Sequence, residues 1–208
     1  MVKRSFFLLA IFVACALSIL AVPLLPPDNA DELLEQSQFR LMNLEGLEIG
    51  FRSEITLAGS GLSDFQEGKI RFSRGRYAIL TPDEAIFCDL NKQWIVDRHN
   101  QDYQVFPYDP QQDLTLEVIF QLFRNKGRAV YEGVVNLDGT PHHKVFIPLS
   151  DSKLDHSRAV VWIHPETFFM SKVVLMDRQQ TTTTYWFFDI VEIADASGLE
   201  FNFNPDKY

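Results

Sequence analysis

The stretch from Glu67 to Trp94 limits most tightly how this chain can fold. Apolar and polar side chains alternate along its first part. Ile70 and Phe72 point to one side of an extended backbone, while Lys69 and Arg71 point to the other. Alternation with a period of two is typical of strands that have one face in an apolar core. The stretch therefore predicts an antiparallel meander with one apolar face.

Two turns divide this meander into three strands. Residues 73–75 form a basic turn around Arg74, and residues 81–84 combine proline with two acids. Between these turns, Tyr77 and Ile79 continue the apolar face. No catalytic motif lies within the meander. The pattern favours a protein that works through an apolar surface rather than through chemistry.

The rest of the chain extends the same architecture. Residues 47–57 alternate strictly, which predicts a strand with one wet face. Further strands are predicted at 94–96, 103–108, 129–135, 144–149, 159–163, 169–176, 182–192 and 199–203. Helices are predicted at 30–42 and 114–124, and the second is apolar around most of its circumference, so it must cover a large surface. Because residues 160–163 and 185–188 are apolar on both faces, we expect one curled sheet in one α+β, mainly β domain.

The N-terminus carries an export signal. Met1–Arg4 is basic, and Ser5–Val22 is an uncharged, mostly apolar run. Three outcomes remain open: cleavage after Ala21, lipidation at Cys15, or retention as a membrane anchor. We expect residues 1–21 to be the signal or anchor, 22–30 a Pro-rich tether and 31–208 the working domain. In each case the domain works outside the cytoplasm, in the periplasm.

The charge of the chain excludes several classes of partner. The formal net charge is −9, and cleavage after Ala21 would remove two basic residues and no acid, giving −11. An acidic domain of this kind argues against nucleic acid and against electrostatic docking on anionic lipid. Without Cys15, Cys88 is the one remaining cysteine, so no intramolecular disulfide supports the fold.

No constellation of residues predicts catalysis, a metal site or a cofactor. His142 and His143 are adjacent, so on a strand they would face opposite ways, and the loop around residues 151–157 offers nothing to orient its triad-type residues. Zinc-protease, paired-cysteine and nucleophile-elbow motifs are absent from the sequence. We therefore predict that the protein is not an enzyme and needs no cofactor.

Taken in order, these elements resemble the LolA-type outer-membrane lipoprotein carriers and their receptor relatives. The resemblance covers the chain from the first helix to the C-terminus. Its components are the alternating strand at 47–57, the stretch 68–72 before a basic turn, residues 89–94, the apolar helix at 114–124, a strand containing Pro148, and the segment 199–205.

The resemblance implies an open, incomplete antiparallel barrel with helices covering its mouth. Its hydrophobic cavity would hold the acyl chains of lipoproteins and pass them to the outer membrane. The implied partners are acylated lipoproteins, an inner-membrane ATP-driven transporter and an outer-membrane acceptor. The alternative is a membrane-anchored lipoprotein receptor or an envelope lipid-sensing protein of the same fold.

The candidate lipid-binding residues are apolar side chains of the predicted strands and of the apolar helix, which could line a cavity or form packed core. They are Phe51, Ile70, Phe72, Tyr77, Ile79, Trp94, Val118, Phe120 and Phe123. The resemblance also implies that Arg74 is a latch that bonds to the helical lid. Two departures from the family pattern are Gly75, where related chains usually have proline, and Leu90, which replaces a turn glycine.

Overall fold

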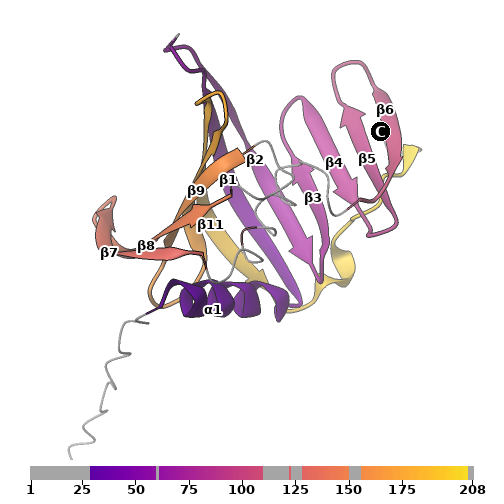
Figure 1. Ribbon diagram of the computed structural model, residues 1–208. Coiled ribbons are helices and arrows are strands. Elements are labelled where there is room, and N and C mark those ends of the chain that lie inside the picture. The colour runs from indigo at the N-terminus through magenta and orange to yellow at the C-terminus, as the bar shows by residue number, and fades with distance from the viewer. Residues whose placement is uncertain (1–28, 60, 110–121, 123–127, 150–155, 206–208) are drawn as a thin grey trace, which may run out of the picture.

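The computed structural model describes residues 29–59, 61–109, 122, 128–149 and 156–205 (Figure 1). In chain order the described elements are α1 (Ala30–Met42), β1 (Gly46–Thr56), β2 (Ser63–Ser73), β3 (Arg76–Leu80), β4 (Glu84–Cys88), β5 (Lys92–Asp97), β6 (Asp102–Pro107), β7 (Val130–Leu137), β8 (Thr140–Pro148), β9 (His156–Ile163), β10 (Met170–Asp177), β11 (Thr182–Ile193) and the 3₁₀-helix η1 (Ala196–Gly198). The two predicted turns of the meander separate β2 from β3 and β3 from β4.

All the described strands form one antiparallel sheet. Their order across it is β6-β5-β4-β3-β2-β1-β11-β10-β9-β8-β7. Neighbours in the sheet are also neighbours along the chain, except that β1 pairs with β11 and so joins the two halves. The sheet ends at β6 and β7, which do not pair with each other, so the barrel stays open. The predicted fold class, a curled and incomplete antiparallel barrel with helical cover, is confirmed for the described residues.

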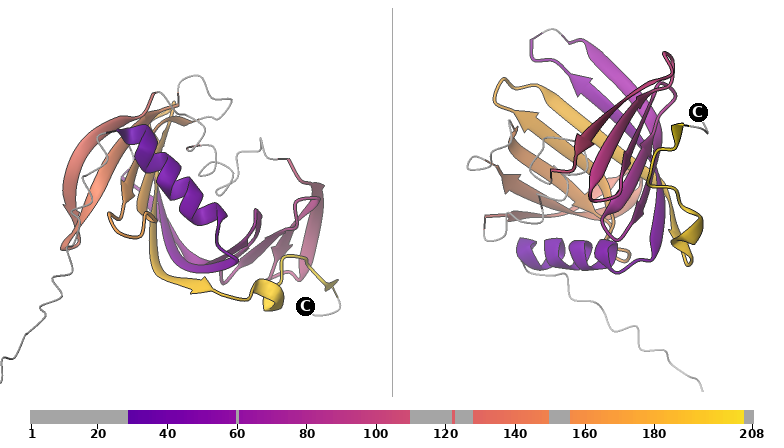
Figure 2. Two further views of the ribbon diagram at one scale, coloured as in Figure 1. Left: turned by 90° about the horizontal axis from the view of Figure 1, so that it is seen from below. Right: turned by 90° about the vertical axis from the view of Figure 1, so that its right-hand side faces the viewer.

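The sheet is curled, and its two faces carry different segments. Figure 2 shows α1 on the concave side, whereas the C-terminal segment with η1 lies on the convex side. The main hydrophobic cluster contains residues of α1 and of both halves of the sheet. A smaller cluster around Phe87 and Phe203 lies beneath the C-terminal segment. The large apolar surface therefore belongs to the concave face.

Local sequence explains where α1 begins and ends. The Asn29 side chain caps the first turn by accepting a hydrogen bond from the backbone N–H of Asp31 at 2.8 Å. Acidic residues occupy the first turn and Arg40 the last turn, which suits the helix dipole. Leu33 and Leu34 are fully buried. The helix is thus held to the sheet by its apolar side and stabilised at both ends.

The convex face is ordered by a row of alternating cations and aromatic rings. The row crosses β1, β11, β10, β9 and β8 and consists of Arg52, Trp186, Lys172, Trp162 and Lys144. Each cation lies 5.1–5.6 Å from the centroid of a neighbouring indole ring. Contacts of this type contribute about 0.5–1 kcal/mol each at exposed sites. The row links five strands on the solvent-exposed convex face, and the concave face remains apolar.

The strand predicted at 199–203 is wrong. Residues 199–203 follow η1 with a bend at Asn202, and they form no strand with the sheet. Phe203 instead packs against Phe87, with ring centroids 6.1 Å apart, and against Tyr103 at 4.9 Å. Phe201 and Phe203 pack on the convex face of the sheet. Their spacing of two residues is the same as the spacing in a paired strand.

Candidate functional site

The register of the sheet aligns apolar side chains into rows on the concave face. One row crosses five strands from β1 to β5 and consists of Leu47, Phe72, Tyr77, Cys88 and Gln93. All five are almost completely buried. The next row contains isoleucines at positions 49, 70, 79, 86 and 95. A continuous hydrophobic surface therefore spans this half of the trough.

Helix α1 closes one end of this surface. Leu33 and Leu34 belong to the same hydrophobic cluster as the concave rows. Arg40, in the last turn, forms an ion pair with Glu192 of β11 and lies 5.5 Å over the Phe169 ring. The helix is thus anchored to the far half of the sheet by one exposed ion pair and one cation–π contact. Both are weak enough to be exchanged without unfolding the sheet.

Most of the described candidate lipid-binding residues come together. They are Phe51, Ile70, Phe72, Tyr77 and Ile79, and all of them are buried in the concave cluster. Trp94 lies elsewhere: it packs with Phe87 and Val96 in the smaller convex cluster. On β5 the residue that faces the concave row is its neighbour Gln93.

The candidates from the apolar segment at 114–124 lie outside the described residues. They are Val118, Phe120 and Phe123. One residue of that segment, Leu122, is described, and it is fully buried in the concave cluster. The N-terminal positions 1–28, including Cys15, also lie outside the described residues.

A buried polar pair in the concave row escaped the sequence analysis. The Gln93 side-chain amide donates a hydrogen bond to the Tyr77 hydroxyl at 2.9 Å. Buried amides and hydroxyls are costly unless they are hydrogen-bonded, and this bond gives the Gln93 amide N–H an acceptor inside the row. The pair therefore lets the apolar surface include two polar side chains. Strand alternation offered one signal, because it places Gln93 on the face opposite Trp94.

Arg74 connects the β2–β3 turn to the segment that follows α1. Its guanidinium donates to the Glu45 carboxylate, and both side chains are more than half exposed. The adjacent Ser73 hydroxyl donates to the backbone carbonyl of Glu45 at 2.6 Å. Glu45 comes three residues after the end of α1 at Met42. The partner of Arg74 is thus the α1–β1 connection rather than the helix itself.

Backbone conformation explains the glycine at position 75. Arg74 and Gly75 have φ values of 51° and 87°. Proline, which fixes φ near −65°, cannot occupy position 75 in this turn, whereas glycine takes a positive φ readily. Leu90, in the β4–β5 turn, has a φ of 74°. A Cβ added at Gly75 would lie 3.5 Å from the Leu90 side chain, which is an ordinary van der Waals contact. The left-handed backbone of the β2–β3 turn thus suits Gly75, whereas nothing in the structure explains the leucine at position 90 in the β4–β5 turn.

The adjacent histidines serve separate contacts. His142 Nε2 lies 2.8 Å from the Ser171 hydroxyl, and His143 Nδ1 lies 3.0 Å from the Tyr131 hydroxyl. Burial, with a smaller contribution from the charge of His142, holds the pKa of His143 below its ordinary value of 6.5. In the described residues, no group of three His, Cys, Asp or Glu side chains is placed to hold a metal ion.

We expect the depressed pKa of His143 to make the protein less stable in mild acid. The His143 ring takes up a proton at a higher pH in the unfolded chain than in the folded chain. Its contribution to the free energy of unfolding is therefore fully present above about pH 6.5. It is lost as the pH falls toward the lower folded pKa. Thermal unfolding from pH 7.5 to 5 should show this decline, and His143→Gln should flatten it. An NMR titration that places the pKa of the His143 ring at or above 6.5 would contradict the prediction.

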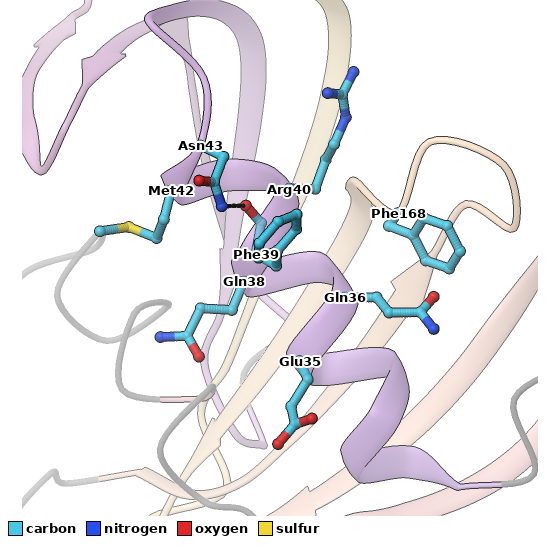
Figure 3. A pocket seen from close by; sticks show the side chains of 8 residues that line it. All are labelled: Glu35, Gln36, Gln38, Phe39, Arg40, Met42, Asn43 and Phe168. Carbon is cyan, nitrogen blue, oxygen red and sulfur yellow. Dashed lines mark hydrogen bonds between the residues drawn. The ribbon is translucent and has the colours of Figure 1, made fainter.

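The outer side of α1 carries a separate groove of about 680 Å³. Figure 3 shows its side chains, with Phe39 between Met42 of the helix on one side and Phe168 of another segment on the other. The Phe39 side chain is 70% exposed. Glu35, Gln36 and Arg40 add polar groups to the lining. This groove lies open to solvent, and its Phe168 side chain also packs against the concave cluster.

Comparison with known proteins identifies a solved structure with a similar fold. No model of a known protein family matches the chain, and neither does any curated protein. Among solved structures, the chain is similar to an uncharacterized conserved protein from Thermus thermophilus, with a TM-score of 0.55 and 9% identity. That likeness covers 79% of this chain and 87% of the other. The two proteins share a fold.

Two further structures are similar at lower scores. One is a LolA superfamily protein from Nitrosomonas europaea, with a TM-score of 0.47, 10% identity, and coverage of 84% of this chain and 98% of that one. The other is a chain of the MucA/MucB complex from Pseudomonas aeruginosa, with a TM-score of 0.47, 15% identity, and coverage of 84% and 60%. A LolA superfamily protein is among the structures that this chain is similar to.

Proposed function

We propose that this protein is a periplasmic carrier that shields the acyl chains of lipoproteins on its concave face and delivers them to the outer membrane. The observation that carries the proposal is the aligned apolar surface, which spans neighbouring strands and is closed at one end by α1. The sequence resemblance to LolA-type carriers and the export signal support it. The function needs binding and release rather than catalysis.

The energetics of hydrocarbon burial define how such a carrier must work. Each buried methylene contributes ~0.8 kcal/mol, so enclosing about eight of them gives roughly 6 kcal/mol. Complete burial of several acyl chains would hold the cargo too tightly for release. The concave face must therefore enclose the chains in part, or expose them when α1 lifts. Loading then requires an external energy source, such as an inner-membrane ATP-driven transporter.

The direct test identifies the bound cargo. The protein is purified from envelope extracts with its own N-terminus, and whatever co-elutes is analysed by mass spectrometry. Acylated lipoproteins are the expected result. Free phospholipid, or no lipid at all, would overturn the carrier function.

Arg74→Leu is expected to change the rate of lipid loading or release several-fold while leaving the thermal midpoint almost unchanged. An exposed ion pair contributes at most about 1 kcal/mol to stability, but Arg74 and Glu45 join the β2–β3 turn to the α1–β1 connection. If α1 must move for a chain to enter, breaking this bond alters the closed state. Transfer of a labelled lipopeptide in a stopped-flow assay measures the rate.

Two matched variants sharpen that experiment. Glu45→Gln removes the other half of the pair and should reproduce the effect of Arg74→Leu. Arg98→Leu removes a cation from a different turn, before β6, and should behave as the unaltered protein. Transfer by Arg74→Leu at the original rate would remove the latch from the mechanism.

The second candidate function is a membrane-anchored receptor or lipid sensor of the same fold. It is favoured by the uncharged run at 5–22, which approaches the ~20 residues that span a bilayer, and by Cys15. No helix in the described part of the chain is long and apolar enough to cross a membrane. Mass spectrometry of the mature N-terminus separates the two functions. A diacylated Cys15 or a retained segment indicates an anchored protein, and a new terminus near Val22 indicates a carrier released into the periplasm.

A further inference from the structure

The hairpin formed by β1 and β2 ends in an exposed apolar tip. Leu57 and Leu62 lie opposite each other there, joined by a hydrogen bond from the Leu57 N–H to the Leu62 carbonyl at 3.2 Å. Their exposed fractions are 48% and 68%, and Ile55 beside them is 41% exposed. The sequence from 55 to 63 contains no charged residue. In Figure 1 this tip extends beyond the neighbouring strand ends.

The tip residues belong to the concave face. Strand residues two apart share a face, so Leu57 and Ile55 follow Phe51 and Leu47 along β1. Leu62 lies on the same side, since it continues the even-numbered positions of β2 that include Ile70 and Phe72. Phe65, three residues after Leu62, lies on the opposite side, where Arg52 lies 4.8 Å over its ring.

Burial increases steadily from the tip toward the interior. Along β1 it rises from Leu57 and Ile55 to Ser53 and Phe51, which are both buried. On the neighbouring β11, Tyr185 and Phe187 stack with centroids 6.3 Å apart and an interplanar angle of 7°. These two rings pack against the concave cluster. Apart from Ser53, the side chains along this path are apolar, and they lead from solvent to the buried rows.

On the same face, the neighbouring strand β2 carries polar side chains beside this path. Asp64 and Gln66 of β2 lie opposite Ile55 and Ser53, and both are exposed. On its β11 side, an amphiphile lying along β1 would thus meet Thr183 first and then the Tyr185 and Phe187 rings. On its β2 side it would meet polar side chains. This arrangement matches a molecule with a hydrocarbon chain and a polar head.

We propose that Leu62, Leu57 and Ile55 form a loading track along which the hydrocarbon chain of an amphiphile first contacts the protein and then moves inward to Phe51. The inference rests on the proposed carrier function and adds the route by which its cargo enters. Loading through the tip leaves α1, at the other end of the trough, in contact with the sheet during the first step.

The test compares substitutions on the two faces of one hairpin. Leu62→Asp and Leu57→Asp place a charge on the track, and Phe65→Asp places the same charge on the convex side at a residue that is 52% exposed. The protein with its natural mature N-terminus is mixed with phosphatidylcholine vesicles that contain a diacylated lipopeptide bearing a fluorophore at the end of one acyl chain. A second series replaces the lipopeptide with a phospholipid that carries the same labelled chain, which distinguishes lipoprotein from membrane lipid as the source.

Leu62→Asp and Leu57→Asp are expected to slow uptake about tenfold or more, the factor that accompanies loss of one leucine contact in the rate-limiting step. The amount bound at equilibrium should stay the same, because the interior is unaltered. Phe65→Asp should load at the original rate. If the track variants match the unaltered protein or are slowed only as much as Phe65→Asp, the loading track is wrong. If the unaltered protein takes up neither probe, the proposed function itself fails.

Discussion

Phe72→Ala is expected to lower the free energy of unfolding by about 3–5 kcal/mol, the range seen when a large buried aromatic side chain is removed. Phe72 is 2% exposed and is the second of the five residues in a concave row, between Leu47 and Tyr77. Its removal would leave a cavity in a row whose strands fix the neighbouring side chains, so collapse around the gap is limited. Urea denaturation followed by circular dichroism measures the loss.

A phenylalanine on the outside provides the control. Phe39→Ala removes the same group from the exposed side of α1 and should change stability by less than about 0.5 kcal/mol. Equal losses for Phe72→Ala and Phe39→Ala would mean that the concave row is not the core that supports the sheet.

Gly68→Ala is expected to destabilise the protein by about 1–3 kcal/mol, because this position has no room for a side chain. A Cβ at Gly68 would lie 2.3 Å from the Leu80 carbonyl oxygen and 2.9 Å from the Phe51 ring. The closest atom belongs to the backbone, so the neighbouring strand itself would have to shift. Phe51 lies directly opposite Gly68 in the β1–β2 register, and its ring fills the space that the missing side chain leaves.

The matched control for this substitution is Gly198→Ala. Gly198 has no heavy atom within 4 Å of an added Cβ, so its replacement should cost far less stability. Thermal unfolding of the two variants under one set of conditions gives the comparison. A Gly68→Ala protein as stable as Gly198→Ala would show that β2 and β3 are not packed as closely as described.

The meander was predictable because its signals are local. Alternation of apolar residues placed Ile70 and Phe72 on one face, and glycine or proline marked the turns at 73–75 and 81–84. Each of these features depends on residues within one or two positions of each other. The same reasoning located α1 from the acidic residues of its first turn and its leucines, whereas the Asn29 cap is seen only in the structure.

The position of Trp94 depends on long-range register, which local patterns do not contain. The pairing of Cys88 with Gln93 sets which face of β5 joins the concave row. A large aromatic residue is the natural candidate for an apolar surface, so Trp94 was preferred to its polar neighbour. Gln93 is accommodated in that row because Tyr77 bonds it. This contact joins residues sixteen positions apart.

The segment at 199–203 shows a second limit of sequence patterns. Alternating phenylalanines are expected wherever an extended chain lies on an apolar surface, whether or not its backbone pairs with a strand. Phe201 packs beneath Arg76, with the guanidinium 4.8 Å from the ring centroid. The spacing of Phe201 and Phe203 therefore comes from side-chain packing on the sheet and not from hydrogen bonding to a neighbouring strand.

The complete burial of Cys88 gives the protein a natural reporter of its own motion. Its thiol lies in the concave row, among the side chains that cargo would have to reach. A thiol reacts with an alkylating reagent only when the reagent can reach it, so modification of Cys88 in the native protein requires the interior to open. The rate of modification, followed by mass spectrometry, therefore measures how often that opening occurs. Occupied and empty protein can be compared in this way without any substitution or attached dye.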